Sequence, residues 1–150
     1  MHTGTNVLHA VSTIGNAFIL KWYYEKCKES DYEPLPVDNL DKDGNTALFL
    51  ACWMGYQGRS MNESDDADVI KKNRLEIVRM LLERGADPNF KSKKLGLTSL
   101  HWAAYHGDVE VVKELLRYKA EIKFDIRDNN TPVDFAGFSG RPEVVEIFCD

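Results

Sequence analysis

The chain has 150 residues, 43% of them hydrophobic and 29% charged, which is the mixture of a folded globular domain and excludes an intrinsically disordered chain. Its net charge is −5, from 19 basic and 24 acidic side chains. This acidic excess argues against a strongly basic nucleic-acid-binding protein and a polybasic membrane-surface protein. The cysteines, Cys27, Cys52 and Cys149, have no Cys-x-x-Cys spacing, so we expect neither a disulfide framework nor a zinc site and infer a reducing compartment.

Neither a secretion signal nor a membrane span is evident in the sequence. The longest apolar run near the N-terminus is only Ala17 to Leu20, which is shorter than the core of a signal peptide. No stretch approaches the ~20 apolar residues that a membrane-spanning helix needs. We therefore expect a chain that does not insert into a membrane and that resides in the cytoplasm, with the nucleus as the alternative.

The dominant feature of the sequence is a repeated pair of short blocks. The first block ends in glycine and occurs at Gly44–Gly55, Gly96–Gly107 and Asn129–Gly140, with a fainter copy at Gly4–Gly15. The second block follows it at Leu75–Leu82, Val109–Leu116 and Pro142–Cys149, and Ala17–Tyr24 is its counterpart in the first copy. Blocks of about ten residues each predict two short helices per repeat. Because neither helix can bury its apolar face alone, successive repeats must stack.

Residues that begin and end helices fall at matching places in the repeats. Threonine is suited to the N-cap, glycine favours a left-handed helix C-terminus, and Pro132 sits at a first helical position, where its missing N–H costs nothing. The expected N-caps are Thr46, Thr98 and Thr131, and the expected C-terminal glycines are Gly55, Gly107 and Gly140. In the second block, i,i+4 spacing places Val111 with Leu115 and Val112 with Leu116 on one face, which predicts a buried face.

These residues resemble the ankyrin-repeat family. Asp41–Gly44, Thr98–Ala104 and Arg84–Asn89 look like pieces of its pattern, which begins Asp-x-x-Gly-x-Thr-Pro-Leu-His-x-Ala-Ala-x-x-Gly and ends in Gly-Ala-Asp-x-Asn. The resemblance covers nearly the whole chain and implies an all-α fold, a solenoid of four stacked helix–turn–helix units with finger-like turns. The expected units span about 4–38, 39–89, 90–122 and 124–150.

Three of the four units depart from the family pattern. The first unit keeps only Leu8-His9 of the motif and has an aromatic second helix, which is either a cap or a docking surface. The second unit carries an insert at 56–73, which we expect to be a solvated loop, with a regulatory or partner-binding loop as the alternative. The fourth unit is cut short, so its last helix would expose Val144, Val145 and Phe148. From this we expect a fragment of a longer protein.

We predict no catalytic, metal-binding or cofactor-binding residue. The sequence contains no Gly-x-Ser-x-Gly, His-Glu-x-x-His, Gly-x-x-x-x-Gly-Lys or Gly-x-Gly-x-x-Gly motif. The resemblance implies that His9 and His101 are structural and bond to the turn of the adjacent unit. Phe49 and Asp134 replace this histidine elsewhere, so we expect an incomplete network. Cys52 takes the place of a small alanine and is expected to be buried. The segment is therefore predicted not to be an enzyme and to take no small-molecule substrate.

The resemblance also implies that partners bind on the concave side, formed by the fingers and the exposed positions of each first helix. Large apolar residues precede the closing glycines, and Trp53, Tyr105 and Phe138 are the expected anchors. Trp102, by contrast, is expected in the core. The full set of predicted partner-binding residues is Trp53, Met54, Tyr105, His106, Phe138, Leu95, Leu97, Lys42, Asp43, Lys94, Arg127 and Asp128.

The predicted function is therefore a monomeric interaction module that holds a protein or an extended peptide. The fingertip cations Lys42, Lys94 and Arg127 favour an acidic or mixed-charge partner. One alternative is a regulatory or scaffolding segment of a larger enzyme or membrane channel, packed on other domains of its own chain. A weaker one is nucleic-acid binding through basic residues, namely Lys71, Lys72, Arg74 and the finger at 91–94.

Overall fold

The computed structural model describes residues 5–54, 67–94, 96–122 and 131–149 of the chain. Within these ranges the backbone forms eight helices and no strand. In chain order they are α1 (Val7–Ile14), α2 (Ala17–Glu29), α3 (Ala47–Met54), α4 (Ala67–Glu83), α5 (Ser99–His106), α6 (Val109–Arg117), α7 (Pro132–Phe138) and α8 (Pro142–Cys149).

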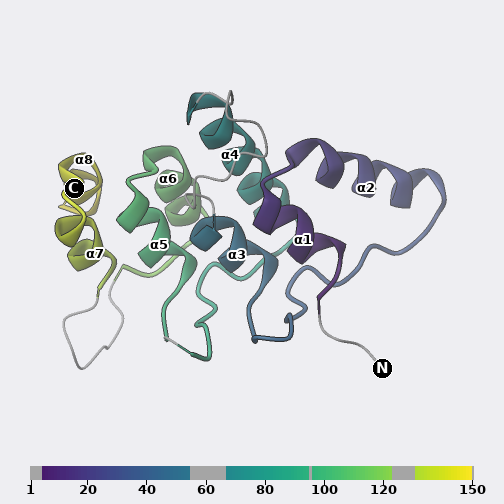
Figure 1. Ribbon diagram of the computed structural model, residues 1–150, viewed down its shortest axis with the longest axis horizontal. Helices are drawn as coiled ribbons and strands as arrows, with labels where there is room; N and C mark the ends of the chain where they lie inside the picture. Colours follow the sequence, from purple (N-terminus) through teal and green to yellow (C-terminus); the bar gives the residue numbers. More distant parts are fainter. Residues whose placement is uncertain (1–4, 55–66, 95, 123–130, 150) are drawn as a thin grey trace.

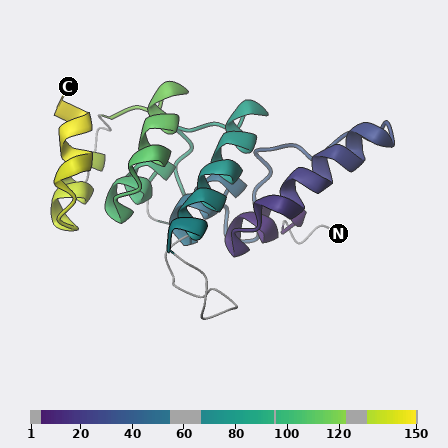
Figure 2. The same cartoon turned by 90° about the horizontal axis from the view of Figure 1, so that it is seen from above.

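The helices stack in two layers (Figure 1). The inner layer consists of α1, α3, α5 and α7, each in contact with the next, and the outer layer of α2, α4, α6 and α8. Figure 2 shows the outer helices side by side in chain order. The connections before α3 and α5 project away from both layers as fingers (Figure 1). This arrangement confirms the predicted all-α solenoid.

Threonine N-caps begin three of the inner helices, as predicted. At the start of α3 the N–H of Phe49 donates to the hydroxyl of Thr46 at 3.2 Å. Thr98 and Thr131 occupy the same place before α5 and α7, and Pro132 is the first residue of α7. Because these caps satisfy N–H groups that have no partner inside the helix, they fix where each inner helix starts.

Left-handed glycines lie at the C-terminal ends of two inner helices, as predicted. Gly107 ends α5 in the left-handed region at φ 73°, as expected. Helix α7 has Ser139 as its C-cap, and Gly140 follows it in the left-handed region at φ 70°, also as expected. The Ser139 hydroxyl donates to carbonyl oxygens of the last turn of α7, so a polar side chain supplies part of the helix end. Gly55 lies outside the described residues.

One hydrophobic core runs between the two layers and through all the stacked helices. Both layers contribute fully buried aliphatic side chains, among them Leu20, Leu48, Ile77, Leu100 and Leu115. Cys52 is buried among them, as predicted. On α6 the predicted face is only partly correct, because Leu115 is fully buried whereas Leu116 is half-buried.

The second unit corrects the predicted extent of the insert. Helix α4 begins at Ala67, so residues 67–73 are helical and do not belong to the expected loop; residues 56–66 lie outside the described part. Arg74 is buried and its Nη1 lies 3.3 Å from Oδ2 of Asp108 in the next unit, which anchors this turn of α4 against its neighbour.

The fourth unit also differs from expectation. Val144 is fully buried rather than exposed, and Val145 and Phe148 are half-buried. The reason is that α8 packs on both α7 and α6, and these two neighbours together cover most of its apolar face.

The sequence left open whether the aromatic residues of α2 form a cap or a docking surface, and the structure divides them into buried and exposed residues. Tyr24 is buried, with the guanidinium carbon of Arg84 lying 3.8 Å from its ring centroid, so it caps the core of the first unit. Phe18 and Trp22 are instead exposed and leave an aromatic surface on the outer layer.

Candidate partner-binding surface

Five aromatic side chains on three successive inner helices form a connected set, which we call the aromatic row: Trp53, Trp102, Tyr105, Phe135 and Phe138. The ring centroids of Trp53 on α3 and Trp102 on α5 are 6.4 Å apart. Trp102 then meets Tyr105 at 5.9 Å and Phe135 on α7 at 6.0 Å, both edge to face. Phe135 continues the row to Phe138 at 6.5 Å. These separations and angles are those that aromatic pairs prefer.

Two members of the aromatic row are exposed to solvent. Phe138 is 73% exposed and Tyr105 is 42% exposed, while Trp53, Trp102 and Phe135 are half-buried. The half-buried rings brace the exposed ones, so the exposed rings are held in place without a partner. A contiguous apolar surface of this kind marks an interaction site more often than scattered single residues do.

His106 joins the row from behind and ties two units together. Its Nε2 donates to the carbonyl oxygen of Trp53 at 3.2 Å, and its ring stacks on Trp102 with the centroids 6.1 Å apart. Burial lowers the pKa of His106 to about 4, and the charges of Arg74 and Arg141 act in the same direction. The imidazole is therefore neutral at pH 7, and its role is to hold Trp53 and Trp102 in register.

The structure brings together four of the predicted partner-binding residues and separates others. Trp53, Tyr105, His106 and Phe138 lie in or against the aromatic row. The prediction for Leu97 is wrong, because its side chain is only 8% exposed. Its carbonyl oxygen accepts the Ser92 N–H at 2.8 Å, which closes the finger. The prediction for Trp102 is also incomplete, since it is half-buried within the row. The side chain of Met54 and all of Leu95, Arg127 and Asp128 lie outside the described part.

The fingertips carry a charged pair. Lys94 Nζ lies 3.2 Å from Oδ1 of Asp43 on the neighbouring finger, and both side chains are well exposed. Such a surface pair contributes little to stability, but it offsets the charge of Lys94. Lys42 and Lys93 are exposed on the same fingers, so the fingers still present positive charge to a partner.

Sequence reasoning missed Phe135 and Arg141. A signal for Phe135 existed, because it occupies the same place in its block as Trp102, directly after Asp134 and His101 respectively. Comparing these positions predicts two large rings on adjacent inner helices. Arg141 had no comparable signal, because its place against the preceding unit depends on tertiary packing.

The motif histidines form hydrogen bonds to backbone groups. His9 donates from Nε2 to the carbonyl oxygen of Asn39 at 2.7 Å, which joins α1 to the next finger as the resemblance implied. Nδ1 of His101 accepts the N–H of the residue that caps its own helix. In α7 the carboxylate of Asp134 takes over this cap by accepting the Thr131 N–H at 2.9 Å. The replacement of histidine by aspartate therefore preserves the cap.

Among the described residues, neither buried Cys52 nor a metal-ligand cluster offers reactive chemistry. Burial raises the pKa of the Cys52 thiol to about 12, so this thiol stays protonated and inert. In the same part of the chain no group of three or more His, Cys, Asp or Glu residues is placed to hold a metal ion. Nor is any helix there long and apolar enough to cross a membrane.

One of the basic residues expected for nucleic-acid binding is not exposed. Lys71 and Lys72 are exposed, but Arg74 is buried in its ion pair with Asp108. A guanidinium that faces a carboxylate inside the protein is not available to phosphate, so this patch is weaker than the sequence indicated.

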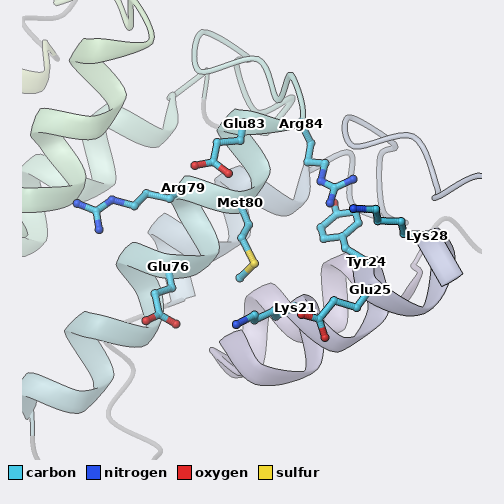
Figure 3. Close-up of a pocket in the computed structure, with 9 residues that line it drawn as sticks. All are labelled: Lys21, Tyr24, Glu25, Lys28, Glu76, Arg79, Met80, Glu83 and Arg84. Carbon is cyan, nitrogen blue, oxygen red and sulfur yellow. The ribbon is translucent and has the colours of Figure 1, made fainter.

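A cleft lies on the outer layer, between α2 and α4 (Figure 3). It has a volume of about 520 Å³. It is lined by Lys21, Tyr24, Glu25, Lys28, Glu76, Arg79, Met80, Glu83 and Arg84. Acidic and basic side chains alternate around the apolar Met80 and Tyr24, and neither a nucleophile–base pair nor a strong charge of one sign is present. This cleft belongs to the outer layer, whereas the aromatic row belongs to the inner one.

The family model for ankyrin repeats, in 3 copies, matches residues 67–150 of the chain. The chain therefore belongs to the ankyrin-repeat family. Repeats of this family generally mediate protein–protein interaction and are generally non-catalytic.

Curated relatives match more than half of this chain. The ankyrin repeat and SAM domain-containing protein 6 of Rattus norvegicus is 28% identical over 138 residues, which is 92% of this chain and 13% of that protein. Palmitoyltransferase AKR1 of Kluyveromyces lactis is 47% identical over 109 residues, 69% of this chain and 13% of that protein. Its namesake from Lachancea kluyveri is 45% identical over 113 residues, 62% of this chain and 15% of that protein. The chain thus spans between 13% and 15% of the length of these relatives.

Proposed function

We propose that this chain is a non-catalytic recognition module that holds a protein or an extended peptide along the aromatic row. One observation carries the proposal: Tyr105 and Phe138 are large, exposed and braced by half-buried rings on three successive inner helices. Rigid aromatic side chains supply much contact area at low entropic cost, and Trp and Tyr are favoured as interface hot spots. Repeats that stack side by side extend this surface across several units.

The test is capture of partner proteins by the immobilised chain and by a Tyr105→Ala, Phe138→Ala double variant. Both side chains are exposed, so we expect the variant to retain the helical circular dichroism and melting temperature of the parent. It is expected to lose the proteins that the parent retains. Recovery of the same proteins in the same amounts would contradict the proposal.

A matched control is available on the opposite layer. Phe18 and Trp22 on α2 are also exposed aromatic residues, and a Phe18→Ala, Trp22→Ala double variant removes a similar apolar area. We expect this control to keep the partners. If both double variants lose them equally, the interaction reflects general stickiness of aromatic residues rather than the aromatic row.

A second candidate function has its own support. Relatives that are 45% and 47% identical to the chain are named palmitoyltransferases, and the chain spans only 15% and 13% of their lengths. Under this alternative the module packs on other domains of a larger enzyme and regulates or scaffolds it. The coding sequence downstream of Asp150 provides the first test, and hydrogen exchange in the longer protein the second. Protection of α5 and α7 in the longer protein beyond that in the isolated chain would favour packing within one chain.

A further inference from the structure

Arg141 lies at the end of the aromatic row. It directly precedes α8, three residues after Phe138 in the sequence, and its aliphatic part lies across the C-terminus of α5. A Cβ atom at Gly107 would lie 2.5 Å from Cδ of Arg141, so the glycine leaves the space that the arginine occupies. Its charge acts on the ring of His106, which is the neighbour of Tyr105. The guanidinium therefore belongs to the end of the inner layer where both exposed rings lie.

The side chain of Arg141 makes no hydrogen bond and no ion pair within the described part of the chain. Its Nε is closed to solvent and has no acceptor, while the residue as a whole is half-buried. Arginine carries five N–H donors, and a partly buried guanidinium without acceptors loses hydration that nothing replaces. Because Nε is sealed, the two terminal nitrogens are the donors left to meet a ligand end-on.

The fingers carry exposed positive charge as well, and the exposed Asp43 among them is paired with Lys94. Lys42 and Lys93 on the fingers are exposed, and neither takes part in an ion pair within the described ranges. Arg141 is a third positive charge, and it is the one that lies beside the apolar surface. A carboxylate fits the guanidinium fork with two parallel hydrogen bonds, and Arg, Tyr and Trp are the residues that most often dominate interfaces.

We propose that Arg141 is a specificity-determining residue that binds a glutamate or aspartate side chain of the partner. The occupant of the surface is an acidic segment of a partner protein, with its carboxylate on Arg141 and bulky apolar side chains on Tyr105 and Phe138. This inference rests on the proposed function, because it names the chemistry of the partner for the same surface.

The test starts from a random peptide library displayed on phage and selected on the immobilised chain. Selected peptides are synthesised with a fluorescent label, and their dissociation constants are measured by fluorescence anisotropy. Each peptide is tested with its acidic residue intact and with that residue changed to the amide. Both forms are titrated with the parent chain, Arg141→Gln and Arg141→Lys. Arg117→Gln on the outer layer serves as the control for loss of one exposed positive charge.

With the parent chain, we expect the amide form of the peptide to bind roughly tenfold more weakly, since charge-assisted hydrogen bonds are the stronger ones. With Arg141→Gln the acidic and amide forms are expected to bind equally, and Arg141→Lys should recover part of the difference. Arg117→Gln should behave like the parent. This coupling between two specific groups is something that loss of stability alone cannot produce.

The remaining outcomes separate the two proposals. Peptides that lose affinity on Tyr105→Ala but ignore Arg141→Gln, or that carry no acidic residue, would overturn the role of Arg141 and leave the aromatic row as the binding surface. Peptides that ignore Tyr105→Ala and Phe138→Ala, or a selection that yields no binding peptide, would overturn both proposals.

Discussion

Truncation of Leu115 to alanine tests the core of the solenoid. Leu115 on α6 is fully buried, and α6 contacts α4, α5 and α8, so the side chain is enclosed by neighbours on several sides. The truncation removes Cγ and both Cδ atoms from the core. Each atom costs about 0.8 kcal/mol, which makes about 2.4 kcal/mol in all. The cavity adds to this, because helices held on several sides collapse little. We expect Leu115→Ala to lower the free energy of unfolding by about 3–4 kcal/mol.

The adjacent residue provides the matched control. Leu116 is half-buried and loses the same atoms on truncation, so we expect Leu116→Ala to cost about half as much. Urea unfolding followed by helical circular dichroism measures both values. Equal effects of the two substitutions would refute the assignment of Leu115 to the core and Leu116 to its edge.

Three further predictions follow from buried or constrained groups. Asp108→Asn removes the charge that faces buried Arg74 and is expected to lower the free energy of unfolding by about 3 kcal/mol, measured by urea unfolding. A loss below about 1 kcal/mol would mean that the pair behaves like a surface ion pair. The folded-state pKa of His106 is about 4, below the value of about 6.5 in an unfolded chain. Its contribution to stability is therefore complete above pH 6.5 and declines as the pH falls toward 4. Urea unfolding between pH 7 and pH 4 should show a shallower decline of stability for His106→Gln than for the parent, and parallel curves would contradict this. Gly107→Ala forces a Cβ onto Arg141 at a backbone φ of 73° and should cost at least about 1 kcal/mol, seen as a lower melting temperature. Gly137→Ala serves as the control: it lies within α7 and no atom lies near the added Cβ, so this variant should melt at or above the temperature of the parent.

The site is less predictable from sequence than the fold because it depends on neighbouring units. The positions before each closing glycine correctly indicated Tyr105 and Phe138 as exposed. They did not indicate that Trp102 and Phe135 complete the row, because a residue between two units is buried only as far as its neighbours are large. Leu97 was assigned to the surface for a related reason, since nothing local shows that the finger closes over it.

Local signals in the sequence determined the repeating architecture. Threonine caps, closing glycines and i,i+4 apolar spacing act within a few residues, so they specify each helix and require the helices to stack. Tertiary structure alone decided how adjacent units meet. The pairing of Arg74 with Asp108 ties α4 to the next unit, and the place of Arg141 over Gly107 puts a guanidinium beside the aromatic row. Both contacts join residues more than 30 positions apart in the chain, where packing between units and not local propensity sets the energy.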